Sequence, residues 1–379
     1  MMNPQAIINL DNLTHNVNEI KKTTGKKIMA VVKSDAYGLG IKKIVPWLSM
    51  QGVDYFVLND DMELIGNRET FKNKKVLLLE SVTGYNYDRI FNISKEVRIT
   101  INNNNDIYTL INYLEKTKLI NIVYVHIAID TKMKRLGFEK IEDVKHAIEL
   151  IKSIPNIILE GIYTHFASEE GNAFLEQQKR FLPYLCLFPF TIVHTASSRF
   201  LTRPIIGNYV RVGMALYQNV NNIPINLKNV LNVYAKPINK MCLEKNDTIG
   251  YDDAYYALKK EKAYILSMGY FEGVLPPFIK MKNKEYKRCG KVCMNHSFYI
   301  IDENEISNTT FLKIFPFHDK INEGKLYKTF VSYQNIKKVY ISTYDKYLPK
   351  AFKSQYAFST KIKKRRRSDK IISIRAIKS

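Results

Sequence analysis

Cysteines are few in this sequence, and long hydrophobic runs are absent from it. Four cysteines in 379 residues cannot build a disulfide framework, which favours a reducing compartment. Cys289 and Cys293 have no second ligand pair at the spacing of a zinc site. The longest apolar stretch, near 184–193, is far shorter than the roughly 20 residues of a membrane-spanning helix. Because the N-terminus also lacks the basic and apolar regions of a signal peptide, we expect a soluble, cytoplasmic protein without a metal site.

Acidic residues are outnumbered, and the basic surplus is concentrated toward the C-terminus. The 58 lysines and arginines against 36 aspartates and glutamates give a net charge of +22. Such a surplus fits either a polyanionic partner, such as nucleic acid or an acidic membrane, or a solvated basic surface. Residues 327–379 contain 15 basic and 2 acidic residues, including the run KIKKRRRSDK at 361–370. We therefore expect a basic C-terminal extension, and we favour a solvated tail over a contact with nucleic acid or anionic lipid.

Short apolar runs rich in β-branched and aromatic residues recur through the first 217 residues. There are eight of them, at 28–33, 54–59, 75–81, 96–101, 122–129, 157–166, 190–196 and 208–217. Several are apolar almost throughout, as buried parallel strands are, and stretches of helical length such as 41–50 and 141–152 lie between them. This alternation predicts an α/β fold, a (β/α)8 barrel of the TIM type. The alternative is an open doubly wound sheet, but no GxGxxG or GxxxxGK[ST] motif follows any of the runs.

The pattern changes at about residue 233. From there, strand-like segments follow one another with short connections, and they lie at 233–244, 263–270, 288–295 and 297–302. We therefore expect two domains, a barrel over 1–232 and a mainly β domain over 233–379 that includes the basic extension.

A lysine ends the first predicted strand of the barrel, and barrel enzymes carry their chemistry at the C-terminal ends of strands. Burial of the Lys33 ammonium group would lower its pKa, as Schiff-base chemistry requires. Gly38 and Gly40 in the following SDAYGLG allow close approach of a ligand such as a phosphate. Alternatively, Lys33 extends out of the barrel mouth and pairs with Asp35. The residues alone leave both readings open.

The segment AVVKSDAYGLG at 30–40 closely resembles the pyridoxal 5'-phosphate attachment motif of alanine racemases. Eight other segments also resemble motifs of this family, and all nine keep the family's order. The eight are INLDNLTHNV (8–17), IDTKMKRLGF (129–138), GIYTHFASEE (161–170), HTASSRF (194–200), YVRVGMALY (209–217), IGYDDAYYA (249–257), MGYFEG (268–273) and GKVCMN (290–295). The resemblance implies a barrel followed by a β domain, with pyridoxal 5'-phosphate as the cofactor.

The resemblance also implies catalytic roles. Lys33 matches the lysine that binds the cofactor and acts as one of two proton-transfer bases. Tyr251 matches the second base, on the opposite face of the substrate, and its ordinary alternative is a half-buried aromatic. In the family this tyrosine reaches the active site of the partner subunit, so a homodimer with shared active sites is implied. Arg211 matches the arginine that faces the pyridine nitrogen, and His165 matches the histidine that links this arginine to the tyrosine.

Further positions match ligand contacts of the family. The cofactor-binding positions are Lys33, Tyr37, His165, Ser198, Arg211, Gly213, Met214 and Tyr270. Arg135 and Met294 match the contacts to the substrate carboxylate, the first through its side chain and the second through its backbone N–H. The sequence also departs from the family pattern. Ala128 stands where the family often has a carbamylated lysine that orients the arginine, and Lys132 and Lys134 replace glycines.

The activity implied by the resemblance is that of an isomerase, an alanine racemase that interconverts L- and D-alanine to supply cell-wall precursors. A racemase of serine or another small amino acid is an alternative, because the size of the pocket cannot be judged from the sequence. A related barrel decarboxylase and a cofactor-binding protein without racemase activity, bearing a basic tail, are further alternatives. The segments around Tyr251 and Met294 favour the racemase over the decarboxylase, and the expected β domain argues against a single-domain cofactor carrier.

Overall fold

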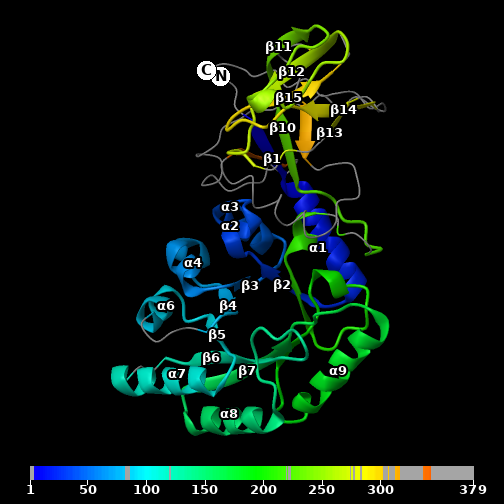
Figure 1. Cartoon of the computed structure of the whole chain (residues 1–379). Helices are drawn as coiled ribbons and strands as arrows, with labels where there is room; N and C mark the ends of the chain where they lie inside the picture. The colour runs from blue at the N-terminus through cyan, green and yellow to red at the C-terminus, as the bar shows by residue number, and fades with distance from the viewer. Residues whose placement is uncertain are drawn as a thin grey trace. The chain divides into compact units, whose positions relative to one another are not determined.

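The computed structural model describes residues 4–81, 86–118, 121–218, 220, 223–273, 275, 278–281, 284–301, 306, 312–315 and 336–342. The chain divides into two compact units (Figure 1). The barrel unit is Asn12–Asn229, and the β unit combines Met1–Asp11 with Val230–Ser379. Within the described residues, no helix has the length and apolar character needed to cross a membrane.

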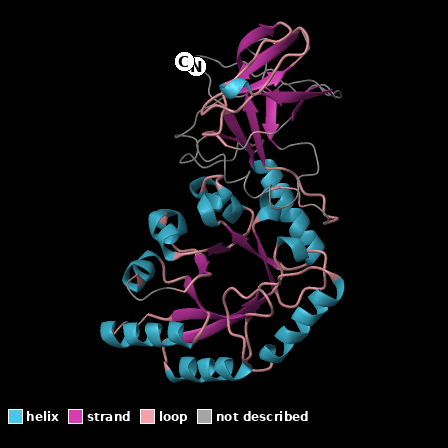
Figure 2. Ribbon diagram, in the orientation of Figure 1, coloured by secondary structure: helices cyan, strands magenta, loops and turns pink. Residues whose placement is uncertain are grey.

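The barrel unit is built on a closed ring of eight parallel strands surrounded by helices (Figure 2). In order, the strands are β2 (Lys27–Val31), β3 (Tyr55–Leu58), β4 (Lys75–Leu78), β5 (Val97–Ile101), β6 (Val123–Ile129), β7 (Ile157–Thr164), β8 (Ile192–His194) and β9 (Tyr209–Val212). Each overlaps one of the eight predicted apolar runs. The predicted (β/α)8 barrel is therefore confirmed.

The helices of the barrel follow the strands. They are α1 (Leu10–Thr24), α3 (Ile41–Met50), α4 (Asp61–Gly66), α5 (Arg68–Phe71), α6 (Tyr87–Ile93), α7 (Asn104–Thr117), α8 (Ile141–Ser153), α9 (Gly171–Leu185) and α10 (Met214–Tyr217), with a 3-10 turn η1 (Ser198–Phe200). The predicted helices 41–50 and 141–152 correspond to α3 and α8. Helix α8 buries Val144, Ile148 and Ile151, whose spacing places them on one face.

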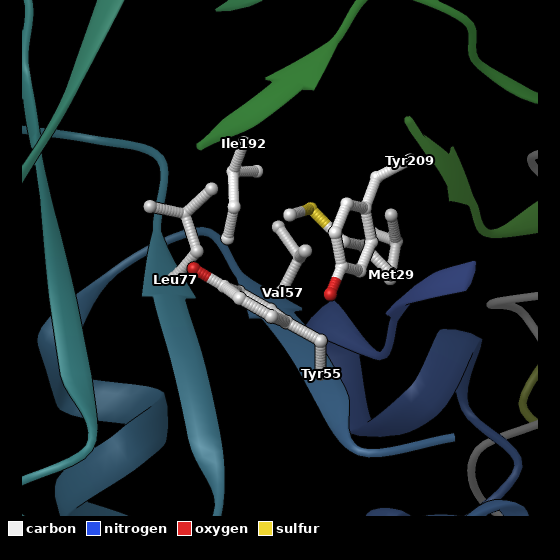
Figure 3. Packing of buried hydrophobic residues seen from close by; sticks show 7 residues of the cluster. Met29, Tyr55, Val57, Leu77, Ile192 and Tyr209 are labelled. Carbon is white, nitrogen blue, oxygen red and sulfur yellow. The ribbon is translucent and has the colours of Figure 1, made fainter. Parts of the chain in front are cut away.

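Apolar side chains from β2, β3, β4, β8 and β9 pack together in one cluster, most of which is labelled in Figure 3. Strands β2 and β3 each contribute two members that are two residues apart, as expected for side chains on one face of a strand. The members of the cluster are Met29, Val31, Tyr55, Val57, Leu77, Ile192 and Tyr209. Polar side chains are buried as well, among them His126, His194 and Arg211. The interior is therefore a packed core that also contains hydrogen-bonding groups.

The described residues of the β unit form two sheets. The first has the strand order β16 (Leu312–Phe315), β10 (Leu231–Ala235), β1 (Gln5–Asn9), β17 (Lys337–Ile341). The second has the order β11 (Pro237–Leu243), β12 (Glu261–Leu266), β15 (Ser297–Ile300), β14 (Lys284–Cys289), β13 (Phe278–Met281). The mainly β character of this part agrees with the sequence-based expectation.

The first strand of the chain belongs to the β unit. Strand β1 pairs antiparallel with β10 and parallel with β17. The prediction assigned residues 1–232, and with them β1, to the barrel domain. The structure groups β1 with the β unit, and the predicted division stays a prediction. Strand β17 lies within the predicted basic extension 327–379, whose run at 361–370 falls outside the described residues.

Candidate active site

Lys33 lies at the C-terminal mouth of the barrel. It follows the end of β2 at Val31 and begins α2 (Lys33–Tyr37). Its side chain is half-buried, and burial lowers its pKa below the usual value for lysine, with a further lowering by the positive charge of Arg135. The carboxylates of Glu80 and Glu63 raise the pKa by less. A lysine whose neutral form is favoured in this way is suited to act as a nucleophile and base.

The residues that follow Lys33 form a left-handed turn. Four residues without a single glycine, Ser34 to Tyr37, have φ values between 53° and 57°. Such a conformation costs roughly 1–2 kcal/mol per residue for an L-amino acid. Glu63 stabilises the turn, because its Oε1 accepts a hydrogen bond of 2.7 Å from the Asp35 N–H. Helix α4 holds Glu63 in place, since the Asp60 side chain caps this helix by accepting the Glu63 N–H. The turn thus fixes Tyr37 relative to Lys33.

Tyr37 meets a cluster of polar groups contributed by η1 and the end of β9. The Ser198 Oγ accepts hydrogen bonds from the Gly213 N–H at 3.3 Å and the Ala215 N–H at 3.1 Å. A Cβ atom at Gly213 would lie 2.1 Å from the Tyr37 hydroxyl, so only glycine leaves room for this tyrosine. Two hydroxyls and backbone N–H groups at one point form a donor set that fits a phosphate group. Met214 follows directly and begins α10.

We predict that Gly213→Ala weakens binding of pyridoxal 5'-phosphate. The added methyl group displaces the Tyr37 hydroxyl and removes one hydrogen bond to the phosphate, which raises the Kd about tenfold. Titration of the cofactor-free protein, followed by absorbance, measures this Kd. Gly171→Ala is the matched control, because no atom lies within 4 Å of a Cβ built there. Equal Kd values for the two variants would contradict the assignment of this phosphate site.

Arg211 on β9 is buried and held by several acceptors. Its Nη1 donates to the His194 Nδ1 at 2.7 Å, and its Nη2 donates to the Thr164 backbone oxygen at 2.6 Å. The His165 Nδ1 lies 3.4 Å from the same Nη2. Burial lowers the pKa of His165 to about 3, and the charge of Arg211 contributes to the lowering. His165 is therefore neutral near pH 7 and can accept at Nδ1 while donating from Nε2.

Arg135 lies on the loop between β6 and α8, and the backbone of this loop is anchored at its base. The Phe138 N–H donates to the Ala128 oxygen, and the Asp130 N–H donates to the Phe138 oxygen, both at 2.8 Å. The Asp130 carboxylate accepts the N–H groups of Lys132 and Arg135. The Arg135 side chain is exposed, and Ala128 offers it no polar group. These hydrogen bonds thus fix the main chain of the loop that carries Arg135.

The remaining predicted site residues belong to the β unit. Tyr251 begins the 3-10 turn η2 (Tyr251–Asp253), and its side chain is 64% exposed. Tyr270 and Met294 lie on adjacent loops, since the Tyr270 N–H donates to the Cys293 oxygen at 3.1 Å. The η2 turn contacts the loop at Lys291, which forms an ion pair with Asp252. These three predicted residues therefore lie on neighbouring loops of one unit, with exposed side chains.

Sequence reasoning did not single out two groups that shape the site. Glu63 accepts a backbone N–H of the left-handed turn. His194 accepts the Arg211 hydrogen bond. A histidine inside an otherwise apolar strand was the signal available for this residue. Among the described residues no cluster of potential metal ligands occurs.

Comparisons with known proteins agree with this arrangement. The family model of the alanine racemase N-terminal domain matches residues 8–219, and that of the alanine racemase C-terminal domain matches residues 230–323. An alanine racemase of Borreliella burgdorferi (strain ZS7) is 31% identical over 316 residues, which cover 77% of this chain and 83% of the relative.

Solved structures share the fold. The structure of an alanine racemase from Clostridium difficile 630 has a TM-score of 0.81 and 23% identity, and the match covers 90% of this chain and 97% of that one. An alanine racemase from Bartonella henselae, solved with covalently bound pyridoxal phosphate, has a TM-score of 0.79 and 19% identity, and the match covers 90% of this chain and all of that one. Family models that together span both units, with a curated relative above 30% identity, show that this chain belongs to the alanine racemase family.

Proposed function

We propose that the protein is a pyridoxal 5'-phosphate-dependent alanine racemase, an isomerase that interconverts L- and D-alanine. The observation that carries the proposal is that Lys33, half-buried and with a lowered pKa, follows β2, while Gly213 of the donor cluster follows the neighbouring parallel strand β9. Membership of the alanine racemase family supports the same activity. The product D-alanine would supply cell-wall precursors. A cytoplasmic location remains a prediction from the sequence.

The residues present fit the cofactor. Tyr37, Ser198 and the N–H groups beside Gly213 would hold its phosphate, with Tyr270 as a further predicted contact, and Arg211 would face its pyridine nitrogen. When bound, pyridoxal 5'-phosphate withdraws electrons from the amino acid and weakens the bond between Cα and its hydrogen. A guanidinium group only donates hydrogen bonds, so Arg211 would leave the pyridine nitrogen unprotonated. An unprotonated nitrogen would limit electron withdrawal by the cofactor and disfavour side reactions such as transamination.

Racemisation requires proton transfer on both faces of Cα. Lys33 holds the cofactor and, in its neutral form, takes or returns the proton on one face. The Tyr251 hydroxyl does the same on the opposite face. His165, kept neutral by burial, connects Arg211 with the tyrosine. Arg135 and the backbone N–H of Met294 hold the substrate carboxylate.

The substrate proposal is alanine, and the test panel includes serine and other small amino acids. Absorbance of the purified protein provides the first test, because a cofactor bound covalently to Lys33 absorbs in the visible range and borohydride reduction makes the link permanent. We expect mass spectrometry to locate the reduced cofactor on Lys33. Absence of the band would contradict the cofactor, and a band without racemisation of any amino acid in the panel would contradict the activity.

We propose further that the protein is a homodimer in which Tyr251 of one subunit completes the site of the other. The exposed position of Tyr251 in the single chain supports this proposal. Mixing inactive Lys33→Ala and Tyr251→Phe subunits, followed by refolding, would then restore activity. Random pairing makes half of the dimers mixed, and each mixed dimer has one intact site, so about a quarter of the sites recover. No recovery, with mixed dimers verified by native mass spectrometry, would contradict the shared site.

A further inference from the structure

A continuous chain of hydrogen bonds runs through the barrel interior behind Arg211. The His194 Nδ1 accepts from Arg211 at 2.7 Å, and the His194 Nε2 lies 2.9 Å from the His126 Nδ1. The His126 Nε2 lies 3.0 Å from Glu160 Oε2, and the Arg98 Nε donates to the same oxygen at 3.0 Å. Both histidines are fully buried. The chain thus leads from the C-terminal ends of the strands to Arg98, near the start of β5.

The chemistry of the two ends fixes where each proton lies. Because the Arg211 guanidinium only donates, the His194 Nδ1 must accept, and its proton must be on Nε2. This Nε2–H then donates to the His126 Nδ1, so the proton of His126 is also on Nε2. That proton faces the Glu160 carboxylate, which only accepts. Every bond in the chain therefore points from Arg211 toward Glu160.

Charges at both ends reinforce this direction. Burial lowers the pKa of His126 and of His194, so both rings stay neutral. Burial alone would raise the pKa of Glu160, but hydrogen bonds from His126 and Arg98 outweigh it and bring the pKa to about 2. Glu160 is therefore ionised, and its second oxygen accepts from the Arg98 Nη2 at 3.2 Å. The Tyr55 hydroxyl donates to Glu160 Oε2 at 3.2 Å, and its oxygen lies 3.0 Å from the His126 Nε2, where it is a second acceptor for the proton of this nitrogen.

The backbone next to Glu160 is adapted to His126. A Cβ atom at Gly161 would lie 2.7 Å from both the Nδ1 and the Cε1 of His126. The backbone φ of Gly161 is not in the left-handed region, so the glycine is required by space and not by conformation. Glu160 and Gly161 together provide the acceptor and the room that this histidine needs.

We propose that Glu160 and His126 are positioning residues for Arg211. They hold His194 in the tautomer whose Nδ1 accepts from Arg211 and thereby fix the guanidinium group at the cofactor nitrogen. Loss of the carboxylate allows the chain to reverse, which puts a proton on the His194 Nδ1 against an Arg211 donor. The effect on the cofactor rests on the proposed function, whereas the proton arrangement is a property of the barrel alone.

The variant Glu160→Gln tests the proposal with almost no change in volume. Both oxygens of Glu160 accept from Arg98, so in either orientation the amide NH2 group opposes an Arg98 donor, and the variant loses the acceptor that holds the chain in one direction. In the orientation that turns the NH2 group toward the His126 Nε2, the chain reverses. Glu176→Gln on α9 is the matched control, since it removes the charge of an exposed glutamate paired with Arg180.

The first readout is the ring nitrogens themselves. In full-length protein labelled with 15N-histidine and free of cofactor, NMR shifts distinguish Nε2–H from Nδ1–H rings. We expect Nε2–H for His126 and His194 in the wild type and in Glu176→Gln, and an added Nδ1–H population of His194 in Glu160→Gln. Gly161→Ala, which displaces His126 and leaves Glu160 in place, is a second variant with the same expected loss of the wild-type tautomer. A wild-type protein with a protonated or Nδ1–H His194, or variants without any change, would overturn the proposal.

The second readout uses the cofactor-loaded protein. Half-transamination is measured as the pyridoxamine phosphate formed, and its rate is divided by the rate of racemisation. In Glu160→Gln we expect this ratio to rise about tenfold, the effect typical of losing one charge-assisted hydrogen bond. An unchanged ratio together with a changed tautomer would show that the chain does not position Arg211. A wild-type protein that binds no pyridoxal 5'-phosphate would instead contradict the proposed function. The proton arrangement would still be tested by the NMR measurement.

Discussion

Lys33→Ala is expected to abolish racemisation, with a fall in kcat of at least about 10⁴-fold. The substitution removes both the covalent link to the cofactor and the base on one face of Cα, and burial of Lys33 lowers its pKa and so favours the neutral amine that both roles require. Racemisation of L-alanine, followed by chiral chromatography, measures the fall. The visible band that borohydride fixes should disappear from the same variant.

The control for this prediction is another lysine nearby. Lys42 on α3 is exposed and has no role in the proposed site, so Lys42→Ala should keep the wild-type rate and the visible band. A Lys33→Ala protein that keeps more than about a tenth of the wild-type rate would remove this lysine from the mechanism.

Tyr251→Phe is expected to lower racemisation by about 10²- to 10⁴-fold, the contribution typical of one general acid–base group. The change removes a single hydroxyl and keeps the ring, so the loop fold should persist. Lys33 still serves one face of Cα. Exchange of the α-hydrogen with deuterated solvent should therefore survive for one enantiomer of alanine while its conversion to the other stops. A tyrosine with a merely structural role would lower both processes together.

Tyr256→Phe is the matched control for Tyr251→Phe. Tyr256 lies five residues further along the same segment and is similarly exposed, at 58% against 64% for Tyr251. The control should retain wild-type exchange with both enantiomers. If Tyr251→Phe racemised alanine as fast as Tyr256→Phe, the second base would have to be sought elsewhere.

The barrel could be predicted because the local amino-acid composition of its strands differs from that of the segments between them. Strand β3 has every residue buried and apolar, so its run stands out from the helices on either side. Helix α8 was visible for a similar reason, since its apolar residues repeat at helical spacing. By contrast, the pairing of β1 with β10 and β17 joins segments more than 200 residues apart. No local pattern encodes such a partner.

The candidate site was predictable in part. Lys33 could be predicted as a site residue from the sequence pattern, because it is a charged residue at the end of an apolar strand. Tyr37, Ser198 and Arg135 were assigned by resemblance alone. Residues 34–37, which form the left-handed turn after Lys33, include no glycine, so their composition does not predict positive φ values. The chain from Arg211 through His194 and on to Glu160 depends on which residues face each other across the closed barrel, and this becomes known only from the structure.

The most direct measurement of the central claim is the fate of L-alanine in deuterated solvent. The purified, cofactor-loaded protein is incubated with L-alanine in deuterium oxide, and both enantiomers are followed by chiral chromatography and mass spectrometry. Because enantiomers have equal free energy in solution, we expect L- and D-alanine to reach equal amounts, each carrying deuterium at Cα. Alanine that stays in the L form, with the cofactor bound at Lys33, would contradict the assignment as an alanine racemase.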